Sequence, residues 1–592
     1  MGRSTKTPVE GSKTAGSADG TSAVGSDFLQ LDIGQAPVGG RTAWLAERLR
    51  SAIADGRLPV GTRLPASRVL AEELQVTRGV VTEAYRRLGE SGQIAGRGRL
   101  GTVVVAAPAA PRDRAPGTLR DNAVGVPGHA LGVPGHAPGT PGPASGTSGP
   151  ALGIPGPALG PMGPGHGPAF FGSADREGVI DTLRSLPCRI DLSPGVPDLA
   201  AFPRTGWLRA ERAVLSGVTP ADFGYGDPRG APALRRAVVG WLARNRGIRA
   251  DPDEVVVVAG VAQALALLGQ LLRAEGIRRI AVEDPGSLGA RQQLEYGGHT
   301  IVPVPVDAGG LDVEALRASG ARAVLTTPAH QFPTGVVLDG ERRRDLLSWA
   351  AEGGVVIEDD YDAEHRYDRP PVPALRSLMP EGVCYAGSVS KLLAPALRVG
   401  WLLVPPDRLD AVVAAKRYAD LGNGILTQLV LARLMDSGDL ERHLRHVRLR
   451  HRRRRDVMLR AIERGLPGAR VHGAAAGLHL MLTFDDRGSG FHDTDLAAEA
   501  LARGVKVHPL SWHRLGAGPP GLVLGYAAGP AHEIDEGIAL VGEALVRAAA
   551  SSADRLDAGT ARGMFEDMAP DPSPTDAAGP GPGSPDPFKE QP

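Results

Sequence analysis

The chain has 592 residues, a formal net charge of zero and only two cysteines. Two cysteines cannot build the framework of a disulfide-stabilised secreted protein, and a neutral chain can bind nucleic acid only through a locally basic region. Residues 1–26 lack the apolar core of a signal peptide, and glycines and glutamines interrupt the most apolar run, Val255 to Leu272. We therefore expect a cytoplasmic protein without a membrane span.

After a disordered tail at residues 1–38, residues 39–106 have the pattern of a small helical domain. Leu45, Leu49 and Ile53 predict a first helix, and residues 61–68 predict a turn into a short second helix that carries Val69, Leu70 and Leu74. Thr77 can cap a third helix that runs to Leu88. A β-hairpin with a basic tip is expected next, around residues 96–101. Three helices and a hairpin make a winged helix-turn-helix, with the third helix reading DNA.

Charge and motif support DNA binding by this domain. Between Arg41 and Val104 there are eleven arginines and six acidic residues, although a solvated helix surface would explain any single arginine. The motifs Leu64-Pro-Ala-Ser-Arg68 and Ala84-Tyr-Arg-Arg-Leu88 resemble the DNA-binding domain of GntR-family regulators. The resemblance implies contact with a double-stranded operator through Arg68, Thr77, Arg78, Thr82, Arg97 and Arg99. Gly79 and Val80 stand where many relatives carry hydroxyl residues, so base preference stays open.

Residues 107–175 have the composition of a linker. No Asp, Glu, Lys or Arg occurs from Asn122 to Ala174, and proline and glycine recur in near-octads. Such a segment cannot bury a core, and its histidines are only a weak signal, so we expect no metal site. From residue 176 to 552 strand and helix signals alternate, as in an α/β sheet covered on both faces. A second disordered tail is expected at residues 553–592.

Lys391 is the most informative residue of this large domain. Only six of the 66 basic residues are lysines, so the chain normally uses arginine where it needs positive charge. A lysine amine can form a Schiff base with an aldehyde, whereas a guanidinium cannot. Ser388, Ser390 and Arg398 flank Lys391, and hydroxyls with an arginine are what an aldehyde carrying a phosphate requires. A surface loop is the ordinary alternative for such a motif taken alone.

Other strand ends supply complementary groups. Gly260 lies between the predicted strand Val255–Val258 and a helix, where free N–H groups can bind a phosphate. The strand beginning at Val355 ends in Asp359 and Tyr361. Because ligands of open α/β sheets bind at the carboxyl ends of strands, we expect these groups to meet Lys391.

This set resembles the fold-type I, aminotransferase-like proteins that bind pyridoxal 5′-phosphate (PLP), a three-layer α/β/α fold. Behind a GntR-type winged helix, it resembles the MocR-type regulators, including the branch that controls vitamin B6 synthesis. The resemblance implies that Lys391 carries PLP, Asp359 pairs with the pyridine nitrogen and Tyr361 bonds the 3′-oxygen. The implied phosphate ligands are Ser388, Ser390, Arg398, the amides after Gly260, and Tyr225 from the neighbouring subunit of a homodimer.

Three positions depart from the transaminase pattern. Ser287 replaces an aromatic residue that commonly contacts the cofactor ring. His330 or Gln331 must substitute for the asparagine that transaminases place on the 3′-oxygen. Val523 occupies the place of the arginine that clamps the substrate α-carboxylate. We therefore expect cofactor binding without efficient turnover.

The arginine-rich run from Arg442 to Arg455 predicts a long helix with Leu444, Val447 and Leu449 inward. We favour a solvated or interface helix over a second DNA contact.

Three functions remain open. The leading hypothesis is a dimeric DNA-binding transcriptional regulator whose large domain senses PLP or a PLP–amine adduct. The second is an aminotransferase that carries a DNA-binding head. The third is a repressor whose large domain has lost the cofactor and only dimerises. Val523 disfavours the second, and the set of Lys391, Asp359, Tyr361 and Arg398 disfavours the third.

Overall fold

The computed structural model describes residues 31–106, 168–172, 178–367, 371–485 and 491–566, except 32, 38, 55–56 and 97–100, with side chains to residue 550. The predicted tails and linker lie almost wholly outside these residues, as do Arg97 and Arg99. The domain boundaries drawn from the sequence therefore stay a prediction.

The N-terminal region is a three-helix unit with a small hairpin, here called the head. Its elements are α1 (Arg41–Ala54), α2 (Ser67–Glu73), α3 (Arg78–Glu90), β1 (Ile94–Gly96) and β2 (Thr102–Val104), the last two paired antiparallel. Leu45, Leu49 and Ile53 pack against Val81 and Leu88 in a core of the head's own. This is the winged helix predicted from the apolar spacing. Thr77 lies at the N-cap position of α3, but its side chain makes no capping hydrogen bond, so that detail of the prediction was wrong.

The rest of the chain, here called the body, is organised around an eight-stranded mixed sheet in the order β4-β11-β10-β9-β8-β5-β6-β7. The strands β10, β9, β8, β5 and β6 run parallel, while β4, β11 and β7 pair antiparallel to their neighbours. The bounds are β4 (Val255–Val258), β5 (Arg279–Asp284), β6 (Thr300–Asp307), β7 (Gly310–Leu311), β8 (Ala323–Thr326), β9 (Val355–Asp360), β10 (Val383–Ser388) and β11 (Gly400–Leu403).

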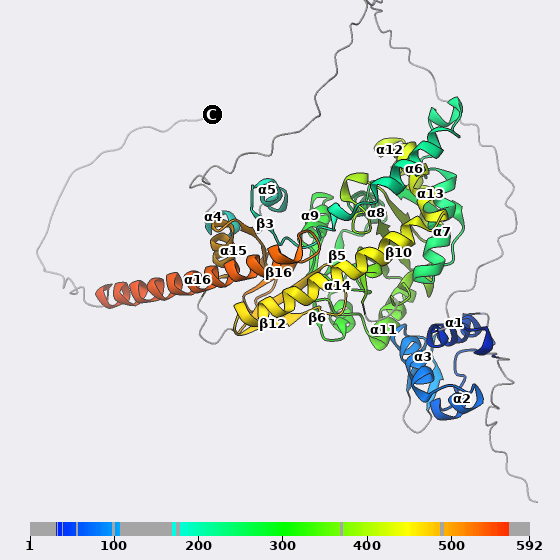
Figure 1. Cartoon of the computed structure of the whole chain (residues 1–592), viewed down its shortest axis with the longest axis horizontal. Coiled ribbons are helices and arrows are strands. Elements are labelled where there is room, and N and C mark those ends of the chain that lie inside the picture. The colour runs from blue at the N-terminus through cyan, green and yellow to red at the C-terminus, as the bar shows by residue number, and fades with distance from the viewer. Residues whose placement is uncertain are drawn as a thin grey trace, which may run out of the picture.

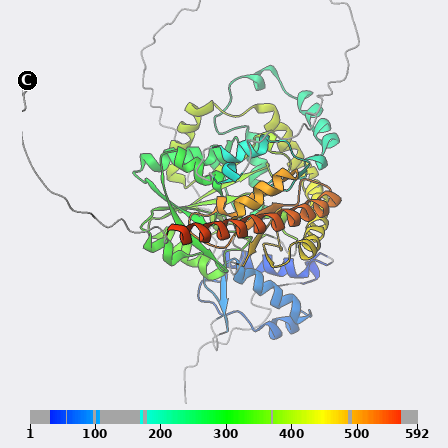
Figure 2. The same ribbon diagram turned by 90° about the vertical axis from the view of Figure 1, so that its left-hand side faces the viewer.

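Helices cover both faces of this sheet, as Figure 2 shows. Because side chains alternate along a strand, Val256 and Val258 of β4 face one helical layer while Val255 and Val257 face the other. The first layer is α8 (Val261–Ala274), α9 (Leu288–Tyr296) and α12 (Leu409–Asp420). The second is α7 (Pro232–Arg246), α10 (Val313–Ala318), α11 (Gly340–Ala351) and α13 (Ile425–Asp436). The sequence predicted this three-layer arrangement.

A smaller unit completes the body. Its sheet has the order β12-β13-β16-β15, formed by β12 (Ala469–His472), β13 (His479–Phe484), β16 (Gly521–Gly525) and β15 (His508–Pro509). A second, two-stranded pair joins β3 (Ile190–Asp191) to β14 (Val505–Lys506). The helices are α4 (Pro168–Phe171), α5 (Val179–Ser185), α6 (Arg204–Leu215, which packs on α13), α14 (Asp439–Gly465), α15 (Asp493–Ala502) and α16 (Ala531–Glu566). Helix α4 precedes residue 176, and its Phe171 stacks on Trp512 with ring centroids 5.4 Å apart. In the described part of the chain, no helix is both long and apolar enough to cross a bilayer.

The head lies against one end of the body in both views (Figures 1 and 2). The last turn of α3 meets the start of α11 so closely that a Cβ added at Gly340 would overlap the carbonyl oxygen of Gly89. Helix α14 runs along the body, with Leu444 and Val447 buried as predicted. Leu449 is 59% exposed, so its predicted inward orientation was wrong. It lies on the side of α14 that lines the cleft between body and head.

Candidate functional site

Two adjacent aspartates at the carboxyl end of β9 lie on opposite faces of the sheet, because side chains alternate along a strand. Asp360 faces the α7 layer, where Arg246 and Tyr385 both donate hydrogen bonds to its Oδ2. Asp359 shares its face with Val355 and Ile357, toward the α8 layer. Its Oδ1 is buried and has no hydrogen-bond partner.

This orphaned oxygen is energetically costly unless a ligand satisfies it. Burial raises the pKa of Asp359 from 3.8 to about 7, with a further contribution from the charge of Asp360 and partial opposition from Lys391. A cationic N–H donor placed at Oδ1 would stabilise the ionised carboxylate. The site therefore favours a protonated ring nitrogen at Asp359.

Lys391 follows β10 and enters the same site. Its Nζ donates to the carbonyl oxygen of Gly195, and a side chain at Gly195 would place its Cβ only 3.1 Å from that nitrogen. Burial lowers the pKa of Lys391, while the Asp362 and Asp359 carboxylates oppose part of the shift. A lowered pKa increases the fraction of neutral amine, the form that attacks an aldehyde.

Tyr361 is joined to a histidine and a second carboxylate. Its hydroxyl lies 3.0 Å from His330 Nδ1, and the same nitrogen is 3.0 Å from Asp362 Oδ1. His330 Nε2 is buried without a partner. Of the two residues considered for the missing asparagine, His330 is the one at Tyr361, because the Gln331 amide donates instead to Glu283 and Pro285.

Gly260 and Arg398 meet at the start of α8, as the sequence predicted from strand ends. Arg398 Nη2 donates to the carbonyl oxygen of Ala259, and a Cβ at Gly260 would lie 3.3 Å from Arg398 Nη1. Ser388 is buried at the end of β10, and its Oγ accepts from the Ser390 amide at 3.4 Å. Helix N-terminal amides, a guanidinium and hydroxyls together form an anion-binding cradle.

The position at which transaminases carry an arginine for the substrate α-carboxylate is apolar in this protein. Val523 is fully buried and packs with Met481, Leu510 and Phe332. His479 and His513 flank Phe332, with ring centroids 4.9 and 5.0 Å away. Burial lowers the pKa of His479 to about 3, so the imidazole is neutral at physiological pH and cannot replace the arginine charge.

Tyr225 does not join this site within one chain. It lies in the loop after the 3₁₀ turn Pro220–Phe223 and is 96% exposed. Two residues that sequence reasoning missed contribute to the candidate site: Gly195, which receives the Lys391 amine, and Asp362, which holds His330. Arg246, also missed, lies on the opposite face of β9, where it neutralises Asp360. Gly195 and Arg246 are far in sequence from Lys391 and Asp360, so no local motif could identify them. Asp362 could have been found, because it directly follows Asp359, Asp360 and Tyr361 in the sequence.

The four predicted DNA-binding residues that the structure describes are all exposed on the head. Arg68 lies in α2, and Thr77, Arg78 and Thr82 lie at the N-terminal half of α3, all exposed. Arg78 Nε donates to Ser67 Oγ at 3.3 Å, which ties the start of α3 to α2. An exposed helix start with an arginine is the usual reading end of a winged helix. Arg97 and Arg99 at the wing are outside the described residues.

Family models match the two parts of the chain separately. Residues 42–104 match bacterial regulatory proteins of the gntR family, and residues 189–540 match the class I and II aminotransferases. The fold and site thus define a winged-helix DNA-binding protein with an aminotransferase-like body.

Several relatives share both parts. The chain is 30% identical over 521 residues to the probable rhizopine catabolism regulatory protein MocR of Rhizobium meliloti, covering 87% of this chain and 96% of that one. It is 30% identical to the pyridoxine biosynthesis transcriptional regulator PdxR of Corynebacterium glutamicum, covering 82% and 91%. The chain belongs to the MocR-type transcriptional regulators.

Solved structures resemble the body. The α-aminoadipate aminotransferase LysN of Thermus thermophilus, complexed with N-(5′-phosphopyridoxyl)-L-leucine, superposes with a TM-score of 0.57 at 28% identity. The match covers 64% of this chain and 97% of LysN. The residues of this chain also fit a pyridoxal phosphate group: an orphaned carboxylate oxygen, a buried lysine of lowered pKa and an anion cradle converge on one sheet edge.

Proposed function

We propose that this protein is a transcriptional regulator that binds PLP, or a PLP–amine adduct, in its body and responds by changing how it binds its operator. Lys391 would hold the cofactor and Asp359 the pyridine nitrogen. Tyr361, with His330, would hold the 3′-oxygen, and Arg398, Ser388, Ser390 and the amides after Gly260 the phosphate. The bound group supplies an electron-withdrawing ring. The residues of this chain bind and orient it.

The single observation that carries the sensing role is the contrast between the two halves of the site. On the cofactor side, the groups at Asp359 and Lys391 are preorganised and lack only a partner for Asp359 Oδ1. On the substrate side, Val523, Met481 and Leu510 form an apolar cluster at the place where transaminases carry the arginine that binds the substrate α-carboxylate. An α-carboxylate there would lose its pairing and its orientation, a cost of about a few kcal/mol.

A homodimer is part of this proposal. Phe223, Tyr225, Tyr418 and Leu421 are all large apolar side chains that are more than half exposed. Exposed aromatic residues of this size are typical of interfaces. Pairing two bodies through these residues would let Tyr225 reach the phosphate cradle of the partner, the role predicted for it from the sequence. We infer a cytoplasmic location, as expected for a protein that binds operator DNA.

The first experiment tests the attachment. Absorbance of the purified chain with PLP, followed by borohydride reduction and peptide mapping, should place the adduct on Lys391. Lys391→Arg keeps the positive charge but cannot form the bond, so it should lose the aldehyde-dependent absorbance band. An adduct on Lys416 or Lys506 would overturn the assignment.

The second experiment separates a sensor from an enzyme on one preparation. Operator affinity should shift with added PLP, and the shift should vanish in Lys391→Arg. Conversion of the cofactor to its amine form by common α-amino acids should stay near background. Brisk conversion by an ordinary amino acid would instead establish an aminotransferase with a DNA-binding head.

A further inference from the structure

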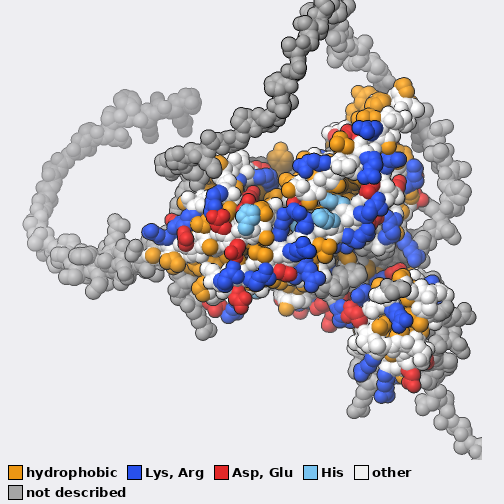
Figure 3. Space-filling view, viewed as in Figure 1, with side chains coloured by type: hydrophobic (Ala, Val, Ile, Leu, Met, Phe, Trp, Pro, Cys, Tyr) orange, Lys and Arg blue, Asp and Glu red, His pale blue; other side chains and the backbone are white. Residues whose placement is uncertain are grey.

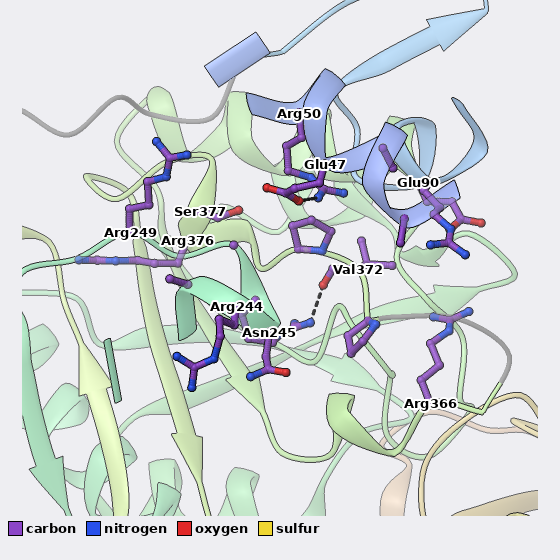
Figure 4. A pocket seen from close by; sticks show the side chains of 18 of the residues that line it. Glu47, Arg50, Glu90, Arg244, Asn245, Arg249, Arg366, Val372, Arg376 and Ser377 are labelled. Atoms are coloured by element: carbon purple, nitrogen blue, oxygen red, sulfur yellow. Dashed lines mark hydrogen bonds and ion pairs between the residues drawn. The ribbon is translucent and has the colours of Figure 1, made fainter. Parts of the chain in front are cut away.

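A large cleft separates the head from the body, away from the cofactor site. Its volume is about 1160 Å³. Helices α1 and α3 form the head wall, and the end of α7 and the loop at residues 371–380 lie opposite them (Figure 4). Helix α14 completes the body wall. None of the residues proposed to bind PLP lines it, and neither do Arg68, Arg78 or Thr82.

The lining is strongly basic. Ten arginines and two glutamates line the cleft, although the whole chain is neutral. On the face shown in Figure 3, basic side chains gather over α14 and α7 and continue toward the head. Like charges gathered in one concave surface repel each other and focus a positive potential there, which attracts anions.

Several of these arginines already have partners within the chain. Arg50 pairs with Glu47, and Arg244 donates to Glu441 at 3.0 Å. Three others, Arg249, Arg445 and Arg452, are exposed, and no hydrogen bond or ion pair engages any of them among the described residues. These three guanidinium groups come from two body elements, the chain just after α7 and helix α14.

A buried donor lies among the same lining residues. Arg246 is fully buried, and Asp360 and the Val372 carbonyl oxygen fix two of its nitrogens. Its third nitrogen, Nη2, is buried and has no hydrogen-bond partner among the described residues. An unpartnered buried guanidinium nitrogen costs free energy that an anion would recover.

From these observations we infer that the cleft binds a small polyvalent phosphate anion, of the class of tripolyphosphate or the phosphate chain of a nucleotide. Arginine guanidinium groups are suited to phosphate because they donate paired hydrogen bonds to its oxygens. The cleft, at about 1160 Å³, exceeds the roughly 300–1,000 Å³ usual for small-molecule sites, so it has room for a molecule of nucleotide size between head and body.

Binding there would stabilise the docked head. One wall belongs to the head, whose Gly89 backbone lies directly on Gly340 of α11. A ligand that contacts both walls binds the docked arrangement better than an undocked one, so it must shift the population toward docking.

The test is calorimetric titration of the full chain with inorganic tripolyphosphate, without PLP, at constant ionic strength set with chloride. Arg445→Ala and Arg452→Ala should each weaken binding about tenfold or more, since each removes charge-assisted bonds. Arg453→Ala is the matched control, because Arg453 is an exposed arginine on the same helix that does not line the cleft. It should leave affinity within about twofold.

Further arms identify the source of the phosphate. Adenosine triphosphate binding tighter than tripolyphosphate would assign a nucleotide, and equal affinity would assign the phosphate chain alone. Absence of tripolyphosphate binding overturns the inference. An equal loss of affinity in Arg453→Ala also overturns it, because it would mean that the positive potential of the whole surface, and not the cleft, attracts the anion. If Arg445→Ala and Arg452→Ala weaken operator binding while tripolyphosphate fails to bind, the cleft residues contact DNA instead.

Discussion

At the scale of single residues, the contrast between Asp359 and Asp360 decides the chemistry of the body. The two carboxylates are adjacent in sequence, and the strand directs them to opposite faces. Each keeps one buried oxygen without a hydrogen-bond partner among the described residues, but Arg246 neutralises Asp360, whereas no ion pair engages Asp359 there. Asp359 is therefore the carboxylate that an incoming cationic donor can pair with.

We expect Asp359→Asn to stabilise the cofactor-free protein at pH 8. The folded pKa of Asp359 is raised from 3.8 to about 7, so the folded state binds more protons than the unfolded state between those values. Stability therefore falls as pH rises through that window and stays reduced above it. The substitution removes this penalty, on the order of a few kcal/mol at most.

Urea unfolding of both proteins at pH 4, 6 and 8 measures this effect. The wild-type chain should show the steeper decline, and the variant should retain PLP less well because the ring nitrogen loses its ionised partner. A pH dependence unchanged by the substitution would contradict the environment described for Asp359.

At the scale of elements, α3 combines two tasks at its two ends. Its first residues, Arg78 and Thr82, are exposed for DNA, whereas the turn after Glu90 contacts α11 of the body. A docked head can therefore keep its reading end free, and any shift of the body contact moves the helix that reads DNA.

Arg78→Ala should weaken operator binding by about 1–3 kcal/mol if the side chain reads a base. Electrophoretic mobility shift or fluorescence anisotropy at fixed salt measures it. Arg86→Ala on the same helix is the control, because Arg86 already pairs with Glu83 and Glu90. Equal losses in the two variants would mean that Arg78 contributes only general charge.

At the scale of the whole molecule, the head–body contact depends on glycine. Gly340 has no room for a Cβ because the Gly89 carbonyl oxygen occupies that space. Gly92 also lies close to the start of α11, because a Cβ added there would be 3.2 Å from the Gly340 carbonyl oxygen. The approach therefore requires a glycine at position 340, while a side chain at position 92 would need only a small shift.

Gly340→Val should displace the head, since overpacking of this kind costs about 1–3 kcal/mol and the head has its own core. Small-angle scattering should report a larger radius of gyration for the variant. Gly289→Ala, where a Cβ meets nothing within 4 Å, should leave the radius unchanged. An unaltered radius in Gly340→Val would show that the contact does not hold the head in solution.

The sequence alone was enough to predict a winged helix followed by an aminotransferase-like body, and to propose most groups of the candidate site. Helical spacing around Leu45 and Leu88 and the buried runs at Val255, Val355 and Val383 are local properties, so they can be recognised without a fold. The rarity of lysine singled out Lys391, and the rule that ligands gather at strand ends joined it to Asp359, Tyr361, Gly260 and Arg398.

Tertiary structure alone decided which distant groups complete these residues. Gly195 reaches Lys391 and Arg246 reaches Asp360 from elements with no fixed spacing to them, and the fold places His330 rather than Gln331 at Tyr361. Leu449 turned outward because the cleft, not a core, lies beside it. Local pattern records which face of a helix or strand is apolar. It does not record what packs there, because that depends on contacts between residues hundreds of positions apart.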